Sequence, residues 1–209
     1  MAVSTHTLIA QEGMPVIFGS IVIAGVLSFA YGIFSIPVWL LALWLVWLYR
    51  DPVRTVPASP LGVISPVEGT ISIAESHPDP YLGRDAQLVR IHMSPTSVYS
   101  IRGAIEGKIM QQWLDQESES KHDVAHAIQI QTDEEDDIVV VLRPGRIFNR
   151  LSCEANIGER IGQGHRCGII PFGSEVDVYV PVSAQLNVKS GDNVVSGESI
   201  LAELSAHSH

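Results

Sequence analysis

The sequence predicts a mostly β domain, a small sandwich or barrel, preceded by a helical hairpin. Residues 13–49 contain no charged residue and are rich in Leu, Ile, Val and Trp. Beyond Pro60, short segments with β-type alternation follow one another between turn residues, and hardly any 3.6-residue periodicity remains. With 209 residues, the chain is long enough for one domain with a sizeable core and an additional segment. We therefore divide it into residues 1–50 and 51–209.

The charge-free stretch is too long for one straight membrane helix. As a single helix it would measure roughly 55 Å at about 1.5 Å per residue, whereas the hydrocarbon core of a bilayer is about 30 Å thick. Gly32 and Pro37 predict a break, which leaves helices over residues 15–31 and 36–49. We expect a transmembrane hairpin, either crossing twice or re-entrant; a buried pair of core helices is the alternative.

Two basic residues, Arg50 and Arg54, follow the second segment closely. Positive charge favours the cytoplasmic flank of a membrane segment, so we expect the soluble domain on the cytoplasmic face of the cell (inner) membrane. The apolar run is longer than the core of a signal peptide and lacks a basic start, which argues against a cleaved signal.

The expected strands are short segments bounded by turn residues. They cover residues 69–74, 88–93, 97–101, 107–110, 127–131, 138–142, 167–170 and 176–180. Two acidic clusters, at 115–119 and 133–137, are expected to be solvated loops, the second of them the tip of a hairpin.

Composition excludes several classes of function. The formal net charge is −10, and no basic patch with interleaved aromatic residues occurs, which argues against nucleic acid as a partner. Neither Cys153 nor Cys167 has the spacing of a metal ligand or a CxxC motif. We expect both to be reduced, small core residues, and we expect no metal site.

A short sequence pattern occurs twice and indicates a glycine-containing turn. Residues 158–164 (GERIGQG) recur as residues 191–197 (GDNVVSG), and each copy precedes an expected strand. The shared pattern resembles turns of small β sandwiches such as biotinyl and lipoyl carrier domains. A carrier would need a lysine at a hairpin tip, but Lys189 precedes the second copy and Lys108 lies in a strand-like segment. Neither lysine fits the carrier alternative.

The dipeptide Gly173-Ser174, between two expected strands, has the composition of a self-cleavage site. The Ser174 hydroxyl can attack the Gly173 carbonyl carbon and convert the peptide into an ester. Elimination would then free residue 174, and loss of ammonia would leave it as a pyruvoyl group, an electron sink suited to decarboxylation. Taken alone, the pair is more often a turn in which Gly supplies a positive φ and Ser bonds to nearby backbone.

Three further segments, together with Gly173-Ser174, resemble the short-chain phosphatidylserine decarboxylase family, whose members are pyruvoyl enzymes made by self-cleavage. The first, YRDPVRTVP at 49–57, is similar to the aromatic-Arg-Asp-Pro motif that follows the family's membrane hairpin. The next two, ISPVEGTI at 64–71 and IHMSPTSVYSIR at 91–102, are similar to Ser-Pro-Ala-Asp-Gly and Met-Ser-Pro-x-Asp-Val-His. The cleavage region itself is GHRCGIIPFGSEVDVYVP at 164–181. The resemblance covers residues 49–204.

The resemblance implies a membrane-anchored carboxy-lyase that cleaves itself between Gly173 and Ser174. Its substrate would be phosphatidylserine or a related serine phospholipid, and its product the ethanolamine lipid. Ser174 would become the covalent pyruvoyl group, Glu68 would orient or polarise the site, and Tyr99 would bind the substrate or donate a proton. Arg102 would pair with a phosphate or carboxylate. An exposed strand edge would also allow a homo-oligomer.

Three positions depart from the family pattern. Glu68 replaces an Asp, while Ser97 and Tyr99 replace the Asp and His of Asp-Val-His. Tyrosine has an ordinary pKa of about 10 against about 6.5 for histidine, so Tyr99 is a donor and a poor base at neutral pH. Candidates for the missing imidazole are His92, His122 and His126. The departures leave a second hypothesis open: an uncleaved, non-catalytic homologue acting in lipid binding or assembly.

Overall fold

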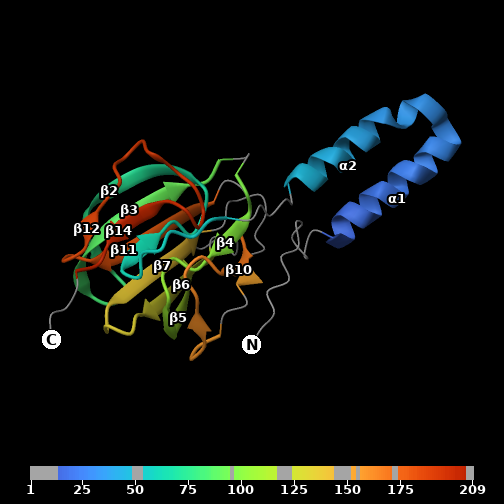
Figure 1. Ribbon diagram of the computed structural model, residues 1–209. Coiled ribbons are helices and arrows are strands. Elements are labelled where there is room, and N and C mark those ends of the chain that lie inside the picture. The colour runs from blue at the N-terminus through green and yellow to red at the C-terminus, as the bar shows by residue number, and fades with distance from the viewer. Residues whose placement is uncertain are drawn as a thin grey trace. The chain divides into compact units, whose positions relative to one another are not determined.

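The computed structural model of the chain describes residues 14–48, 54–94, 97–116, 124–143, 152–153, 156–170 and 174–205. The chain forms two units, Met1–Val53 and Arg54–His209. The described part of the first unit is helical, and that of the second is built of β strands (Figure 1). The prediction of a mostly β protein is confirmed.

The helical unit consists of α1 (Met14–Tyr31) and α2 (Ile36–Leu48), joined by the 3₁₀ turn η2 (Gly32–Ser35). Gly32 has a φ of 56°, in the left-handed region that ends helices. Pro37 lies in the first turn of α2, where its missing N–H removes no hydrogen bond. Within the described residues, neither of these helices nor any other has the combined length and apolar character that a membrane crossing requires.

The β unit contains one large, curled sheet and two small ones, and the paired strands are antiparallel (Figure 1). The large sheet has the order β13 (Asn193–Val194), β2 (Gly69–Asp79), β3 (Arg84–His92), β11 (Glu175–Pro181), β7 (Asp137–Arg143), β6 (Val124–Gln131), β5 (Gly107–Gln116), β9 (Arg160–Ile161). The small sheets have the orders β1 (Gly62–Ile64), β14 (Ile200–Glu203), β12 (Gln185–Leu186) and β4 (Ser100–Arg102), β10 (Arg166–Ile169), β8 (Ser152–Cys153).

Three sequence-based boundaries need correction. Asp115 and Gln116, expected in a solvated loop, are the last residues of β5, because β5 stays paired with β6 as far as Gln116 opposite Val124. The rest of that acidic cluster lies outside the described residues. Residues 97–99, expected to begin a strand, precede β4. The hairpin tip is confirmed, but it is shorter than 133–137: β6 ends at Gln131, β7 already begins at Asp137, and Asp136 is buried.

The β unit is an internal repeat with approximate twofold symmetry. Counted inward from its two edges, the large sheet has equivalent strands in the same order. These are β13, β2, β3 and β11 from one edge and β9, β5, β6 and β7 from the other. The antiparallel pair Val178 and Val140 lies at its centre. The two small sheets also correspond, and each has a register shift at the same place, at Val63/Ile64 and at Arg166/Gly168.

The two glycine-containing turns are structurally equivalent parts of this repeat. Their four glycines all have positive φ values: Gly158 (89°), Gly164 (73°), Gly191 (96°) and Gly197 (77°). In the first turn the Glu159 carboxylate accepts a hydrogen bond from the Asn156 N–H at 2.9 Å. In the second, Asp192 accepts one from the Lys189 N–H at 2.8 Å. Glycine is required here because side chains rarely adopt this backbone conformation.

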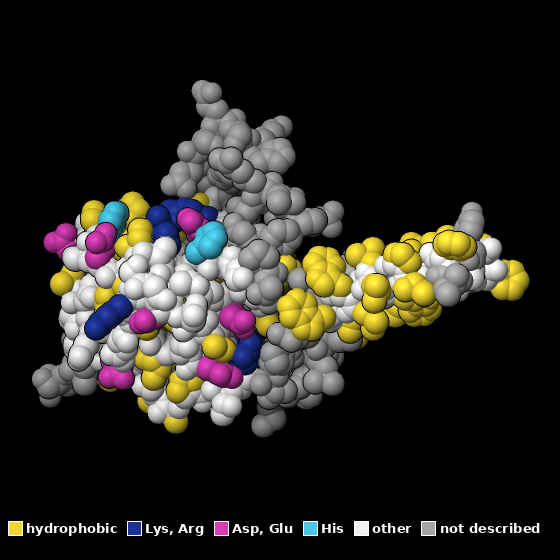
Figure 2. All heavy atoms as spheres, turned by 90° about the horizontal axis from the view of Figure 1, so that it is seen from above, with side chains coloured by type: hydrophobic (Ala, Val, Ile, Leu, Met, Phe, Trp, Pro, Cys, Tyr) yellow, Lys and Arg dark blue, Asp and Glu magenta, His cyan; other side chains and the backbone are white. Residues whose placement is uncertain are grey.

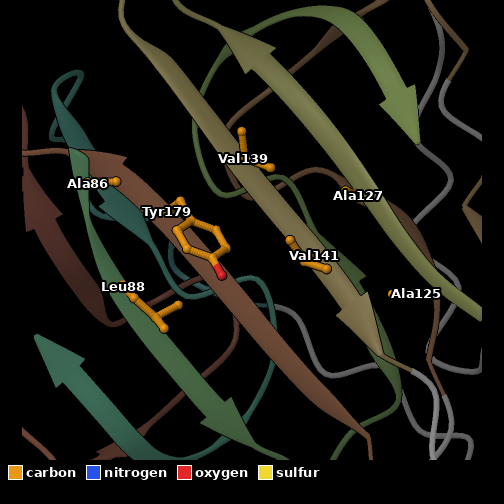
Figure 3. Packing of buried hydrophobic residues seen from close by; sticks show 7 residues of the cluster. All are labelled: Ala86, Leu88, Ala125, Ala127, Val139, Val141 and Tyr179. Carbon is orange, nitrogen blue, oxygen red and sulfur yellow. The ribbon is translucent and has the colours of Figure 1, made fainter. Parts of the chain in front are cut away.

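One face of the large sheet carries small and branched side chains around Tyr179 (Figure 3). The Tyr179 ring lies between Leu88 of β3 and Val139 and Val141 of β7. Tyr81, from the β2–β3 turn, packs over this cluster and against Trp113 of β5, with ring centroids 5.4 Å apart. The packing fixes β11 between its neighbours and so fixes the position of the residue that precedes it, Ser174.

Candidate active site

Ser174 lies directly before β11, in the middle of the large sheet. It is fully buried, and its backbone carbonyl accepts a hydrogen bond from the Met93 N–H at 3.1 Å. The next residue, Glu175, is paired with His92 of β3 on one side and Arg143 of β7 on the other. Ser174 is therefore held by sheet pairing. Gly173, the other half of the predicted cleavage site, lies outside the described residues.

Tyr99 lies beside the segment that leads to Ser174. Its carbonyl accepts a hydrogen bond from the Ile170 N–H at 2.9 Å, which continues the pairing of Ser100 with Ile169. The Tyr99 side chain is buried, with 8% of the residue exposed. Three residues lie between Ile170 and Ser174 in the sequence, so Tyr99 is paired with the segment that leads to the serine.

Glu68 lies on the other side of β3 from Ser174. Gly69 passes so close to β3 that an added Cβ would lie 2.4 Å from the His92 carbonyl oxygen. Because β2 and β11 flank β3, two strand spacings put the backbones of Glu68 and Ser174 about 10 Å apart. The Glu68 carboxylate forms a salt bridge with Arg54 at 2.7 Å. It is therefore an oriented charge near the site.

Arg102 links segment 64–71 with both glycine turns, 158–164 and 191–197. Its N–H donates to the Pro66 carbonyl at 2.9 Å, and its guanidinium donates to the Gly164 carbonyl at 3.1 Å. A Cβ on Gly197 would lie 2.8 Å from Arg102 Cδ, so the side chain packs closely on that turn. The predicted role in substrate binding stays a prediction.

The three motif segments of the β unit are thus joined by backbone hydrogen bonds. Segment 91–102 donates to segment 64–71 through Arg102, donates to segment 164–181 through Met93, and accepts from it at Tyr99. Segments that are distant in sequence are thereby brought together, and one of these bonds holds Ser174.

The two candidate imidazoles that the structure describes, those of His92 and His126, lie on strands β3 and β6. His92 is more than half exposed, with its ring 3.6 Å from the Glu175 carboxylate. Side chains alternate along a strand, so His92 and Glu175 share the face opposite to Met93 and Ser174. His126 of β6 is in register with Leu142, which is in register with Val176, so it lies two strands from β11. Burial lowers the pKa of His126, and its Nε2 lies 3.3 Å from Gln112 Oε1. His122 lies outside the described residues.

Sequence reasoning missed Asp177, which is fully buried in β11. Arg90 donates to its two oxygens at 2.6 and 2.9 Å from β3, and Arg143 contacts it from β7. The hydrogen bond to Asp177 raises the pKa of Arg90. Because the partners come from both neighbouring strands, the cluster fixes the register of β11 three residues after Ser174. The only signal in the sequence is an acidic residue inside the apolar run of 176–180.

Comparison with known proteins agrees with this geometry. The chain matches the family model for phosphatidylserine decarboxylase over residues 41–202. Proteins named phosphatidylserine decarboxylase proenzyme from Nitrosomonas europaea and Cupriavidus pinatubonensis are 36% and 34% identical, over 95% of this chain and 96% of their own lengths. One from Neisseria gonorrhoeae is 34% identical over 95% of this chain and 80% of its own. No solved structure matches the chain.

The chain therefore belongs to the phosphatidylserine decarboxylase family, and the resemblance inferred from its motifs is confirmed. The family is one of carboxy-lyases.

Proposed function

We propose that the protein is a self-processing decarboxylase that converts phosphatidylserine, or a related serine phospholipid, into the corresponding ethanolamine lipid. The position of Ser174 is the observation that carries the proposal: the serine of the cleavage motif is fully buried and held by β3 at the point where the motif segments meet. The relatives are named as proenzymes, which favours a self-processing enzyme over an uncleaved homologue.

Self-cleavage in this site would begin with the Ser174 hydroxyl oxygen attacking the Gly173 carbonyl carbon. The C–N bond breaks as the ester forms, and the released amine takes a proton. Removal of the Ser174 α-proton then expels the Gly173 carboxylate, and water replaces the amine, which leaves as ammonia. The bond from the Met93 N–H to the residue 174 carbonyl is unaffected by these steps and would keep the new chain end in place.

The site fits a pyruvoyl group at position 174, because the group keeps the bonded carbonyl and needs no more room than serine in a fully buried position. When formed, it would supply the electron sink for loss of carbon dioxide. Tyr99 would donate a hydrogen bond or a proton to the substrate, and Glu68 would orient the substrate's charged head group through its fixed carboxylate. Arg102 would act on a phosphate or carboxylate.

The internal repeat supports the assignment of Tyr99. Equivalent hydrogen bonds identify its counterpart: Ile170 N–H donates to Tyr99, and Leu204 N–H donates to Leu61, both at 2.9 Å. The other half of the repeat thus has an apolar residue at the equivalent position. A hydroxyl that one half of the repeat has and the other lacks, on the segment paired with the one that leads to Ser174, is a candidate for function.

The helical unit is proposed to attach the enzyme to the membrane, with the β unit on the cytoplasmic face of the inner membrane. Support comes from its lack of charged residues between positions 14 and 48 and from the exposed aromatic side chains of Phe18, Phe29, Phe34 and Trp44. An anchor of this kind would hold the site next to a substrate that stays in the bilayer.

The direct test is an assay of purified protein with vesicles that contain phosphatidylserine. Release of carbon dioxide with formation of phosphatidylethanolamine is expected, and Ser174→Ala should show none. A wild-type protein that binds these vesicles but releases no carbon dioxide would point to the non-catalytic homologue.

A further inference from the structure

The α1–α2 hairpin exposes apolar side chains along both helices. Among them are Phe18, Phe29, Phe34, Leu40 and Leu43, each more than 60% exposed. In Figure 2, yellow hydrophobic side chains cover the visible face of the helical unit. A helix that is apolar on all its sides is stable in a protein core or in lipid. Together with the lack of charge, this makes lipid the partner that fits.

The serine hydroxyls of the hairpin and the Trp39 indole are bonded within it. The hydroxyls of Ser20, Ser28 and Ser35 each lie 2.8 Å from a backbone carbonyl oxygen three or four residues earlier. The Trp39 indole N–H donates to Ser28 Oγ at 2.9 Å, which ties α2 to α1. The Ser28 and Ser35 hydroxyls are also 2.8 Å apart. Hydrocarbon offers no hydrogen bonds, so internal bonding of this kind is what a turn inside a membrane needs.

The length of α2 limits how deep the turn can reach. Its 13 residues measure about 20 Å at about 1.5 Å each, against about 30 Å for the hydrocarbon core. Arg50 follows two residues after its end and sets the limit of the apolar segment. With Arg50 among the head groups, η2 lies inside the hydrocarbon region.

The composition of the turn agrees with this depth. The turn η2 reads Gly-Ile-Phe-Ser, and Phe34 within it is 83% exposed. Phe29, one turn earlier, is 96% exposed. On the far aqueous side both rings would stand in water, whereas inside a leaflet both are covered by acyl chains.

We propose that the hairpin is a re-entrant anchor: it enters one leaflet, turns at η2 within the hydrocarbon, and leaves through the face by which it entered. This inference rests on the proposed membrane attachment and specifies its form. It places both ends of the anchor at the face of the bilayer that carries the β unit, the face from which the enzyme would take its lipid.

The test uses cysteine labelling of the full-length protein in vesicles of phosphatidylethanolamine and phosphatidylglycerol. Phe34→Cys and Phe29→Cys each probe the turn, so one of them still gives a result if the other fails to fold. Met14→Cys, at the start of α1, is the matched control. A membrane-impermeant maleimide is added outside or trapped inside, and labelling is compared with that of the parent chain, which keeps its own two cysteines.

A re-entrant turn predicts that positions 29 and 34 stay at the parent level from both sides and are labelled fully in detergent, while position 14 is labelled from the side of the β unit. Labelling of position 34 from the opposite side would overturn the proposal and leave membrane attachment intact. Labelling from the side of the β unit, with protein that alkaline washing releases from the vesicles, would contradict the attachment itself.

Discussion

Ser174 and Asp136 occupy equivalent positions in the two halves of the β unit. The Ser174 carbonyl accepts from the Met93 N–H at 3.1 Å, and the Asp136 carbonyl accepts from the Thr132 N–H at 2.9 Å. Each residue stands directly before a central strand and is buried. The fold therefore provides two similar positions, of which only one carries a hydroxyl group, and each half can serve as a control for the other.

Glu68 and Glu106 are the first such pair. Each precedes a glycine, Gly69 or Gly107, whose added Cβ would lie 2.4 Å from a carbonyl oxygen of the neighbouring strand. Glu68→Gln should lower the rate of decarboxylation at least about ten-fold, because an oriented charge near the substrate is lost. Glu106→Gln, in the half that has Asp136 in place of Ser174, should leave that rate unchanged. Equal losses in the two variants would show that the glutamate serves the fold.

Tyr99 is expected to act in the decarboxylation step. Tyr99→Phe should lower kcat at least about ten-fold through loss of a donor. Tyr179→Phe is the matched control: it is also buried, but on the opposite face of β11 from Ser174. Tyr99→His should leave self-cleavage as fast or faster. A normal kcat in Tyr99→Phe would show that the Tyr99 hydroxyl takes no part in decarboxylation.

Asp177→Asn should strongly destabilise the fold. The change leaves Arg90 and Arg143 without their buried counter-charge, and loss of one partner from a buried ion pair typically costs about 3–5 kcal/mol. Asp133, which pairs with Arg160 at 2.8 Å on the exposed surface, is the control. Asp133→Asn should change little. Urea unfolding of both variants compares their free energies of unfolding. A similarly small change in both would contradict the role of Asp177 in holding β11 in place.

Stability should depend on the protonation of His126. Burial lowers its pKa in the folded protein, so the unfolded chain, with a pKa of about 6.5, takes up the proton first as the pH falls. The resulting stability is full above about pH 6.5 and is lost below it, toward the lower folded pKa. His126→Gln should therefore lose less free energy of unfolding than wild type between about pH 7.5 and about pH 5.5. Identical losses would count against this account.

Much of the fold could be predicted because its signals are local. Alternation identified the strands, and the glycines of 158–164 and 191–197 marked the turns, since positive φ leaves a trace in the sequence itself. The larger repeat is also visible in the sequence, as the similar segments VEGTI at 67–71 and IEGKI at 105–109. This similarity was missed because the sequences of the two halves differ elsewhere.

The surroundings of the site could not be predicted in the same way. The contact of Asp177 with Arg90 and Arg143 depends on the register of three strands that are distant in sequence. The end of β5 was taken for a loop because charge suggested solvent, yet a strand at an exposed position tolerates charged residues. Leu114, 75% exposed in the same strand, shows how open that position is.

The central claim is that Ser174 is the point of self-cleavage, and the intact mass of the purified protein tests it most directly. The account predicts two chains, one ending at Gly173 and one of residues 174–209 that begins with a ketone. Ser174→Ala should remain a single chain, and Ser100→Ala, at another buried serine, should be cleaved normally. A wild-type protein that remains one full-length chain after long incubation would contradict the account.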